Sequence, residues 1–432
     1  MRGKIMFSLK KDFILGVATA STQIEGGRVN SNWNDFCDRK KTNDGSDVAR
    51  ANMHYEKVKE DIELLKKLKI EAYRMSIEWA RIEPERGAFN APALSHYREE
   101  LALLKQAGIK PLVTLYHFSH PMWFEKLGGF EKKENIDIFL RFVETCIKEL
   151  GELCDDYITI NEPNVYAVQS YFLGLWPPEQ KSFIKTIKVM NVFIAAHCKA
   201  YELIHKIRKE KGFNSTRVSF AHHVQAFHPK NPKSGFDRFS TKQLTHLFQD
   251  GIMKACFKGE FIFPFKNILK IEKKQYADFI SINYYSRQAV RGFAYKPFTG
   301  TPKNDLGWDI YPQGLIECAK TCYDYVPMPI VVSENGTCDN RDRFRSRYIY
   351  DHLKAISESA LPFEAYYHWC FIDNFEWKEG EAARFGLVYC DYETQKRTVK
   401  TSGEFYRELI EKKAVDDSMM EKYVLPCKYD IK

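Results

Sequence analysis

The sequence has no hydrophobic run long enough to cross a membrane, because no stretch approaches the roughly 18 apolar residues that a spanning helix needs. The first apolar stretch, Phe13–Ala20, superficially imitates a signal peptide, but it is short, contains Gly16 and Thr19, and follows charged residues. The eleven cysteines are irregularly spaced and form no C-x-x-C pair, which argues against a disulfide framework and a zinc site. These absences predict an unprocessed, soluble, cytoplasmic protein with reduced thiols and no membrane partner.

The chain also lacks a strong excess of one charge. It has 65 Lys and Arg residues against 57 Asp and Glu residues, a formal net charge of +8 spread over 432 positions. In Lys57–Lys67 the basic residues are mixed with acidic ones, which is typical of a solvated helix face. With 44% hydrophobic and 14% aromatic residues, the composition is that of a globular protein. We therefore expect neither general disorder nor a nucleic-acid partner.

Short apolar runs recur along the whole chain, and longer stretches with helical periodicity separate them. Their hydrophobicity is continuous rather than alternating, which indicates strands buried on both faces of a parallel sheet. We identify eight such runs: Phe13–Ala20, Ala72–Ile77, Pro111–Tyr116, Tyr157–Ile160, Val218–Ala221, Phe279–Tyr284, Pro329–Val332 and Ala365–Trp369.

The stretches between the runs have the periodicity of amphipathic helices. In Tyr55–Leu68, for example, Val58, Ile62 and Leu65 recur about one helical turn apart, with charged residues between them. The other predicted helices are Leu101–Gln106, Asn135–Leu150, Lys185–Lys211, Gln313–Tyr325 and Phe344–Ser359.

Eight strand and helix units close naturally into one barrel, so we predict an α/β fold, a single (β/α)8 TIM barrel over residues 1–432. No linker interrupts it. The polar segments Phe227–Phe236 and Lys296–Asp305 lie between runs and are expected to be elaborated βα loops. A short C-terminal tail from about residue 415 is expected either to pack back on the barrel or to contact a partner.

The residues at the ends of the runs are unusually polar for positions next to buried strands. In a barrel of this kind the carboxyl ends of all strands meet at one mouth, where active sites lie. Seven of the eight runs contribute to this set: Gln23, Arg74, His117, Asn161, Glu162, Asn283, Tyr285, Glu334, Trp369, Glu376 and Trp377.

Each of these residues has an ordinary structural explanation, because a carboxylate after a strand often caps the next helix. Their convergence on one mouth favours a binding site for a polyhydroxylated ligand, with aromatic rings as platforms for a sugar. Glu162 and Glu334, at the ends of the fourth and seventh runs, would face each other across this mouth. A glycosidase needs such a pair of carboxyl groups.

Several motifs carry a specific resemblance over essentially the whole chain. Phe13–Gly26 (FILGVATASTQIEG), Tyr157–Pro163 (YITINEP) and Ile330–Gly336 (IVVSENG) resemble three signatures of glycoside hydrolase family 1, the β-glucosidase family. Further matches are Tyr73–Trp79, Asp278–Tyr285, Asp309–Leu315, Asp373–Trp377 and Arg384–Leu387.

This resemblance implies a retaining, exo-acting β-glycosidase that works by double displacement. Glu334 would be the nucleophile, and Glu162 the general acid and then the general base. Arg74 and Tyr285 would contact the nucleophile, and we expect them to keep Glu334 ionised while Glu162 stays protonated. Neither a metal nor an organic cofactor is expected.

The resemblance also implies a set of substrate-binding residues. Asn161 matches the residue that holds the sugar 2-OH, and Gln23, His117 and Trp369 match those on the 3-OH and 4-OH side. Glu376 matches the residue that binds the 4-OH and 6-OH. The remaining members of the set are Asn283, Trp308, Trp377 and Phe385, with Trp308 at the edge of the aglycone side.

Other polar residues near the runs have structural interpretations. We expect Glu78 to belong to a barrel-floor or loop network, and Asp373 and Asn374 to brace a turn. Of His222 and His223 we expect one to be a buried structural residue and neither to be a metal ligand, and we expect His197 to be a packing or loop-bracing residue. Phe118 follows His117 where the family commonly has Trp, so we expect the site to lack an indole there.

The expected substrate is a small β-glycoside or oligosaccharide, namely an unphosphorylated β-D-glucoside, with β-galactosides and β-fucosides as further candidates. An alternative is a 6-phospho-β-glycosidase, although that branch typically has Ser at the position of Glu376, with Lys and Tyr at those of Ala383 and Phe385. A second alternative is a non-catalytic sugar-binding relative, but both catalytic glutamates are present. The sequence leaves a homo-oligomer open.

Overall fold

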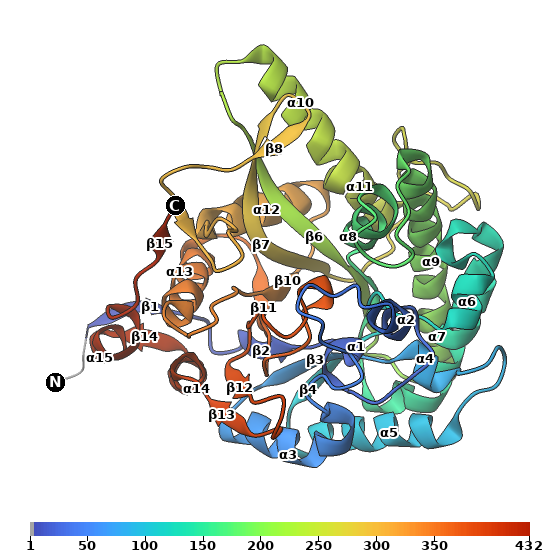
Figure 1. Cartoon of the computed structure of the whole chain (residues 1–432), viewed down its shortest axis with the longest axis horizontal. Coiled ribbons are helices and arrows are strands. Elements are labelled where there is room, and N and C mark those ends of the chain that lie inside the picture. Colours follow the sequence, from blue (N-terminus) through green and yellow to red (C-terminus); the bar gives the residue numbers. More distant parts are fainter. Residues whose placement is uncertain (1–3) are drawn as a thin grey trace.

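The structure is a computed structural model that describes residues 4–432 (Figure 1). Its centre is a closed barrel of parallel strands, in which β10 pairs with both β11 and β7 and thereby completes the ring. The barrel strands in chain order are β2 (Ile14–Ala18), β3 (Ala72–Ser76), β4 (Lys110–Thr114), β5 (Asp156–Asn161), β6 (Arg217–Pro229), β7 (Ile280–Arg291), β10 (Ile330–Asn335) and β11 (Phe363–Trp369). The predicted (β/α)8 TIM barrel is confirmed.

Burial on both faces explains why these strands have no alternating pattern. Every residue of β3, β5 and β10 is buried, since one face of each strand lines the barrel interior and the other lies under a helix. All eight predicted runs coincide with a barrel strand. Most ends differ by a few residues, but β6 and β7 continue well beyond the predicted ends, to Pro229 and Arg291.

Helices surround the barrel (Figure 1). They are α1 (Ser21–Ile24), α2 (Asn32–Asp38), α3 (His54–Lys67), α4 (Trp79–Ile82), α5 (Ala91–Gln106), α6 (Met122–Lys126), α7 (Ile136–Leu150), α8 (Pro163–Ala167), α9 (Phe183–Glu210), α10 (Gly235–Thr245), α11 (Gly251–Lys258), α12 (Pro312–Tyr325), α13 (Arg345–Glu358), α14 (Thr401–Lys412) and α15 (Asp417–Met419). The predicted helices correspond to α3, α5, α7, α9, α12 and α13. The prediction for α5 began ten residues late, at Leu101, because its first turns are rich in polar residues.

The loop expectations were only partly right. Strand β6 extends to Pro229 and α10 begins at Gly235, so much of Phe227–Phe236 is regular structure. In Lys296–Asp305, the strands β8 (Ala294–Lys296) and β9 (Pro302–Lys303) occupy part of the segment.

The C-terminal tail packs back on the body of the protein. Strand β14 (Ala414–Asp416) pairs with β1 (Ile5–Ser8), and β15 (Asp430–Ile431) pairs with β9. A short hairpin of β12 (Val388–Cys390) and β13 (Arg397–Val399) precedes α14. The tail therefore belongs to the fold of the chain itself.

All eleven cysteines lie within the described residues, and each is a buried free thiol. Cys318 and Cys322 share the buried face of α12. In residues 4–432, no helix combines the length and the apolar character needed to cross a membrane.

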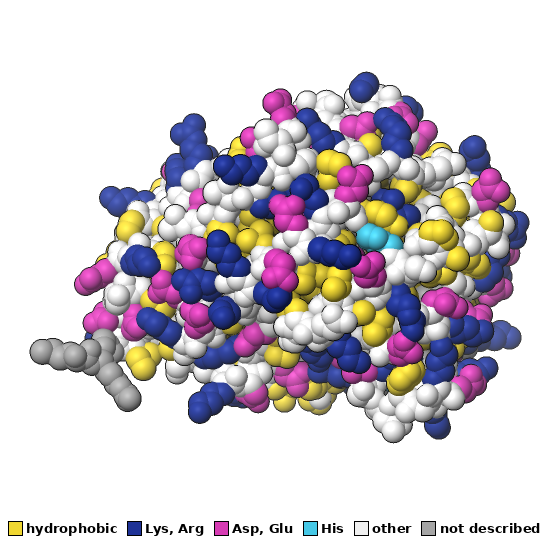
Figure 2. All heavy atoms as spheres, turned by 90° about the horizontal axis from the view of Figure 1, so that it is seen from below, with side chains coloured by type: hydrophobic (Ala, Val, Ile, Leu, Met, Phe, Trp, Pro, Cys, Tyr) yellow, Lys and Arg dark blue, Asp and Glu magenta, His cyan; other side chains and the backbone are white. Residues whose placement is uncertain are grey.

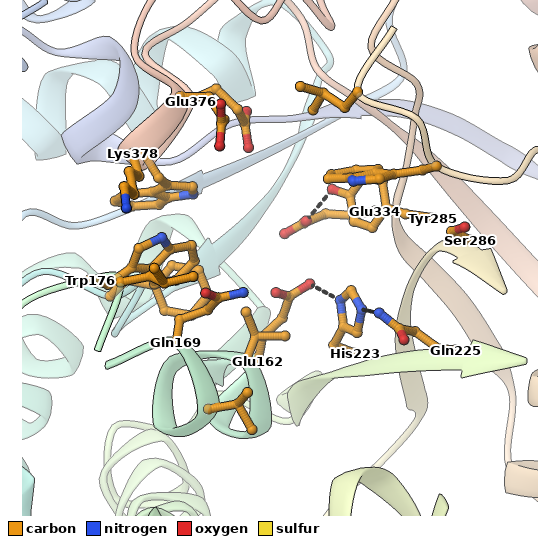
Figure 3. Close-up of a pocket in the computed structure, with 18 of the residues that line it drawn as sticks. Glu162, Gln169, Trp176, His223, Gln225, Tyr285, Ser286, Glu334, Glu376 and Lys378 are labelled. Carbon is orange, nitrogen blue, oxygen red and sulfur yellow. Dashed lines mark hydrogen bonds and ion pairs between the residues drawn. The ribbon is translucent and has the colours of Figure 1, made fainter. Parts of the chain in front are cut away.

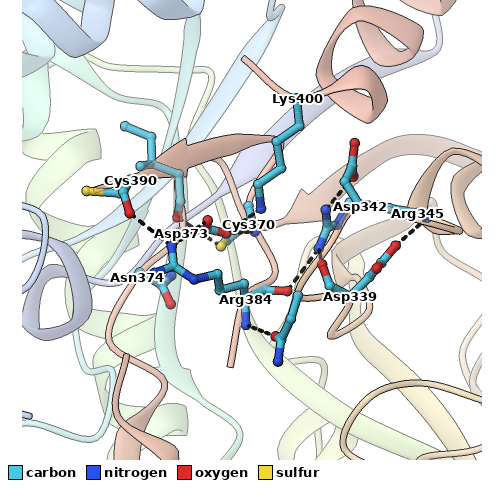
Figure 4. Close-up of polar contacts among 12 residues, drawn as sticks. Asp339, Asp342, Arg345, Cys370, Asp373, Asn374, Arg384, Cys390 and Lys400 are labelled. Carbon is cyan, nitrogen blue, oxygen red and sulfur yellow. Dashed lines mark hydrogen bonds and ion pairs between the residues drawn. The ribbon is translucent and has the colours of Figure 1, made fainter. Parts of the chain in front are cut away.

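A buried polar cluster fixes the loop after β11 (Figure 4). Asp373 accepts hydrogen bonds from Lys400 Nζ at 2.7 Å, from Arg384 at 3.1 Å and from the backbone N–H of Gly386 at 2.9 Å. This loop leads directly to Glu376, so Asp373 braces one wall of the barrel mouth, as expected from the sequence.

A second buried cluster joins α3 to α5 on the outside of the barrel. The ring of His54 bonds to Asp61 at 2.8 Å through Nδ1 and to Glu100 at 3.0 Å through Nε2. Burial lowers the pKa of His54, but the negative charges and hydrogen bonds of Glu100 and Asp61 outweigh it and raise the pKa to about 10. Arg397 also bonds to Asp61 at 3.0 Å, so two cations face two carboxylates.

We expect His54→Gln to destabilise the protein by about 3–5 kcal/mol near pH 6, because it leaves buried carboxylates without a charged partner. The raised pKa of His54 makes its stabilisation complete below about pH 6.5, progressively weaker above it, and absent beyond about pH 10. Denaturant unfolding of both proteins from pH 6 to 10 measures this. The difference between them should shrink as the pH rises, and a constant difference would contradict a charged His54.

Candidate functional site

A cavity of about 450 Å³ opens at the carboxyl ends of the barrel strands (Figure 3). Because the strands are parallel, the side chains at their ends all reach this mouth. Ten of the thirteen candidate residues line the cavity: His117, Asn161, Glu162, Tyr285, Trp308, Glu334, Trp369, Glu376, Trp377 and Phe385. Gln23, Arg74 and Asn283 lie behind its wall and hydrogen-bond to residues that line it.

Glu334, in β10, is held by residues of two other barrel strands. The Tyr285 hydroxyl of β7 donates to Oε2 of Glu334 at 2.6 Å (Figure 3). Arg74 of β3 donates to Oε1. Both oxygens therefore have a fixed donor, which orients the carboxyl group in the mouth. The arrangement leaves no freedom for this side chain to rotate without losing a charged hydrogen bond.

The ionised state that we expect for Glu334 is opposed by its burial. Burial raises the pKa of Glu334 to about 7, and the charge of Glu162 raises it as well, although Arg74 and Tyr285 lower it. The sequence showed the two stabilising donors but not the burial that opposes them.

Glu162 stands at the sharp turn between β5 and α8. Its backbone has a φ of +41°, and Pro163 begins the helix directly after it. The Asn283 amide donates to Oε1 of Glu162 at 2.8 Å, and Nδ1 of His223 lies 2.9 Å from the same oxygen. Oε1 is therefore occupied by two neighbours, which leaves Oε2 as the oxygen available to a ligand.

His223 is a site residue that the sequence interpretation missed. It lines the cavity, and its Nε2 lies 3.2 Å from the amide nitrogen of Gln225 (Figure 3). If that amide donates, Nε2 is the acceptor and Nδ1 carries the proton that His223 donates to Glu162. His223 lies opposite Asn283 in the pairing of β6 with β7, which brings both side chains to Glu162.

Asn161 ties the two sides of the mouth together. Its Oδ1 accepts from Arg74 Nη2 at 2.7 Å and from Asn283 Nδ2 at 3.0 Å, and its Nδ2 donates to His117 Nε2 at 3.0 Å. Nδ1 of His117 must then carry a proton, yet it has no partner among the described residues although it is buried. Burial and the charge of Arg74 lower the pKa of His117, so the ring is neutral. A sugar hydroxyl is a suitable acceptor for this unpaired donor.

Glu376 marks a third acidic position in the mouth. Gln23 lies 3.4 Å from its Oε2 and donates to the Phe375 carbonyl at 2.7 Å, while Gln23 Oε1 has no partner in the described chain. Burial raises the pKa of Glu376 to about 8; a hydrogen bond from Trp369 lowers it, and the charges of Glu334 and Glu162 raise it. Near pH 7 the carboxyl group is therefore largely protonated, so it can both donate and accept.

Aromatic rings form much of the remaining wall. The Trp377 ring packs on Trp33 at 4.7 Å and Trp176 at 5.7 Å between centroids, and both Trp176 and Trp377 line the cavity. The site therefore does not lack indoles beside Phe118, which itself lies 5.1 Å from Trp176. On the other side, Trp308 packs edge-on against Tyr285 at 5.9 Å.

Several residues that we interpreted as structural are indeed held within the protein. Glu78 accepts from Thr22 at 2.5 Å and from Ser119 at 2.9 Å, and His197 bonds to Thr159 at 2.7 Å. His222 is buried without a partner among the described residues. Within residues 4–432, no group of three His, Cys, Asp or Glu side chains is arranged to hold a metal ion.

The barrel and the acidic, sugar-compatible mouth define a glycoside hydrolase fold, and comparison with known proteins assigns the family. The model of glycosyl hydrolase family 1 matches residues 6–415. The chain is 31% identical to β-glucosidase A of Thermotoga maritima, covering 94% of this chain and 98% of that protein. It is 32% identical to β-glucosidase A of Acetivibrio thermocellus, with 93% and 97% covered. The chain belongs to glycosyl hydrolase family 1 and is an enzyme that hydrolyses glycosides.

Solved structures give the same result. A β-glycosidase from Pyrococcus horikoshii has a TM-score of 0.88 and 33% identity, with 97% of this chain and 99% of that chain covered. A β-glucosidase from Thermotoga maritima in complex with glucoimidazole has a TM-score of 0.88 and 28% identity, with 95% and 100% covered.

The contact between His223 and Glu162 can be tested with paired variants. His223→Leu removes a hydrogen bond to a catalytic-site carboxyl group, and we expect it to lower kcat/KM on a chromogenic β-glucoside by about 1.5–3 kcal/mol, or roughly 10- to 150-fold. His223→Asn keeps an amide donor and should lose less. Steady-state kinetics of both variants across pH 5–9 measures this, and equal losses would show that the hydrogen bond is not the cause.

Proposed function

We propose that the protein is a retaining, exo-acting β-glycosidase that hydrolyses unphosphorylated β-D-glucosides, with β-galactosides and β-fucosides as further substrates. The observation that carries the proposal is the contrast between two carboxyl groups in one mouth. Glu334 has a donor on each oxygen, whereas Glu162 has both of its donors on Oε1. The names of the β-glucosidase relatives support the same substrate class.

In the first step, Glu334 acts as the nucleophile. Its carboxylate attacks the anomeric carbon and forms a covalent glycosyl-enzyme. Arg74 and Tyr285 hold the attacking group in position. At the same time, Glu162 gives a proton from Oε2 to the glycosidic oxygen, so that the aglycone leaves as a neutral alcohol.

In the second step, Glu162 acts as a base. It removes a proton from a water molecule that occupies the place of the aglycone, and this water attacks the anomeric carbon. The bond to Glu334 breaks, the sugar leaves with its original β configuration, and Glu162 regains its proton. The two steps need no metal or organic cofactor.

The glycone would occupy the part of the mouth that carries unpaired polar atoms. Nδ1 of His117 and Oε1 of Gln23 have no partner in the described structure, so sugar hydroxyls would satisfy buried groups that otherwise cost free energy. Glu376 would bind the 4-OH and 6-OH, and Trp377 would stack at that end. The packing of Trp377 on Trp33 and Trp176 supports exo action, because these rings form a wall at the end of the mouth where the terminal sugar would lie.

The remaining parts of the proposal concern the molecule as a whole. We propose that residues 1–432 form one catalytic domain and that the protein acts in the cytoplasm. A homo-oligomer remains open.

A 6-phospho-β-glycosidase is the competing function, and Lys378, which lines the cavity, is the one observation in its favour. Against it, the phosphate would meet Glu376 where that branch has Ser. Ala383 and Phe385 are buried and apolar, and neither provides a phosphate donor.

Retention is tested by NMR of the first sugar anomer released from an aryl β-glucoside. We expect β-glucose first, followed by slow mutarotation, because the geometry of a retaining enzyme holds the carboxyl groups about 5–5.5 Å apart. Initial release of α-glucose would contradict double displacement.

Glu376 distinguishes the two substrate classes. We expect Glu376→Ser to lower kcat/KM on an unphosphorylated glucoside by about 1.5–3 kcal/mol, roughly 10- to 150-fold, because it removes contacts to two hydroxyls. Glu379→Ser is the matched control, since Glu379 also lines the cavity but bonds to Asn43 at 2.9 Å, and it should change little. Steady-state kinetics of the wild type and both variants on glucosides and 6-phosphoglucosides test which substrate class the enzyme prefers. A wild type that prefers the phosphorylated substrate would overturn our choice of substrate class.

A further inference from the structure

The outer end of α10 and the β7–β8 hairpin form one projection beside the mouth, which we call the tip and define as residues 230–245 and 287–300. In Figure 1 these elements extend furthest above the barrel. Phe236 of α10 and Phe293 of the hairpin contact each other, with ring centroids 5.9 Å apart. Two segments about 50 positions apart in the sequence therefore build a single surface.

The tip exposes four aromatic side chains that lie close together. Phe236 is 59% exposed, Phe239 is 54% exposed and Phe293 is 59% exposed, and Tyr295 beside them is 49% exposed. Burying these rings would release free energy from the hydrophobic effect, so their exposure points to a partner. The rings also continue toward the mouth, because Tyr295 packs on Phe227 at 5.8 Å and Phe227 packs on Phe248 at 5.7 Å. Both Tyr295 and Phe248 line the cavity.

The charges around these rings have one sign. The tip carries the following exposed cations: Lys230, Lys233, Arg238, Lys242, Arg291 and Lys296. Its single acidic residue is Asp237, which is buried and accepts from the backbone N–H groups of Asn231 at 3.2 Å and Gly292 at 3.1 Å. Among the ion pairs of residues 4–432, none involves any of the six cations.

Other parts of the surface differ from the tip. On the face shown in Figure 2, basic and acidic side chains are interspersed. On α3 and α5, Lys57 pairs with Glu60 at 2.7 Å, Lys66 with Glu63 at 2.7 Å and Lys59 with Glu99 at 2.8 Å. The tip differs from these helices because its exposed cations surround exposed aromatic rings and its only acidic residue, Asp237, is buried.

We propose that the tip docks on an anionic lipid bilayer and holds the mouth of the barrel close to the membrane surface. Phenylalanine rings on a basic amphipathic surface insert at the boundary of headgroups and acyl chains, while Lys and Arg attract anionic lipids. A projecting convex surface can reach a flat bilayer, whereas single-stranded nucleic acids are bound in grooves. The inference does not rest on the proposed substrate.

This inference revises the expectation from the sequence that the chain has no membrane partner. That expectation rested on the absence of a long apolar run, which tests for a spanning helix and not for a peripheral contact. The rings of the tip are separated by polar residues in the sequence and gather only when α10 packs beside the hairpin.

The test is co-sedimentation of the full-length wild type with vesicles of phosphatidylcholine containing 30% phosphatidylglycerol, compared with vesicles of phosphatidylcholine alone. We expect the protein to bind the anionic vesicles at least tenfold more tightly than the neutral ones. Its binding to the anionic vesicles should weaken as NaCl is raised to 1 M. Equal sedimentation with both vesicles, or none with either, would overturn the proposal.

Two variants and a control localise the contact. The triple variant Lys233→Glu, Arg238→Glu and Lys242→Glu should weaken binding by roughly 100-fold, since each cation near an anionic membrane contributes about fivefold. Phe236→Ser with Phe293→Ser should weaken it by about tenfold or more without changing the charge. The control Lys206→Glu, Lys209→Glu and Lys211→Glu, on the exposed end of α9, makes the same change of charge and should weaken binding far less.

Activity on a soluble aryl β-glucoside serves as the check on folding, because none of the substituted residues lines the cavity. It should be unchanged in all three variants. If the control loses as much vesicle binding as the tip variant, or if the tip binds RNA or protein while the vesicles do not bind, the proposal is wrong. Vesicle binding is measured without a glycoside, so its failure would leave the proposed reaction untouched.

Discussion

Arg74 is fully buried in the middle of β3, and its guanidinium group bonds both to Glu334 and to Asn161. Three glutamates, Glu162, Glu334 and Glu376, line the same cavity. Burial raises the pKa values of Glu334 and Glu376 well above the ordinary range for this side chain, and the negative charges of the neighbouring glutamates raise them further. Arg74 opposes this effect at Glu334 and favours the carboxylate.

The barrel provides the hydrogen-bonding partners that these buried carboxyl groups require. A buried charge is tolerated only when it is paired and hydrogen-bonded, and the parallel strands supply partners from different parts of the chain at a fixed spacing. Asn161 accepts from both Arg74 and Asn283, which connects the surroundings of Glu334 to those of Glu162. A change at any of these positions would leave a polar group without a partner, so the site depends on the whole ring of strands.

The sequence was sufficient for the barrel because each strand is a short apolar run that ends in a polar residue. It was also sufficient to place Glu162 and Glu334 at the mouth, because each lies two residues after the end of such a run. It could not predict the role of His223, because the contact with Glu162 depends on how β6 is aligned with its neighbours. The raised pKa of Glu334 likewise depends on burial, and no local pattern reveals how many other carboxyl groups share its cavity.

The same limit applies to the outer surface. The periodic pattern of α7 and α9 identified them as helices. The polar start of α5 concealed its first ten residues, and the Pro-, Gly- and Lys-rich approach to α10 concealed that helix. Neither of the two sequence segments that form the tip indicates a binding surface by itself. Only the packing of Phe236 against Phe293 brings the exposed rings and the unpaired cations together.

The central claim is that Glu334 forms a covalent bond to the sugar. A 2-deoxy-2-fluoro-β-glucoside with a reactive leaving group tests it most directly, because the fluorine destabilises the oxocarbenium-like transition states and a good leaving group lets the intermediate accumulate. Peptide mapping by mass spectrometry should find one fluoroglucosyl group per protein, attached to Glu334. A label on another residue, or turnover of this reagent without any labelled protein, would contradict the account.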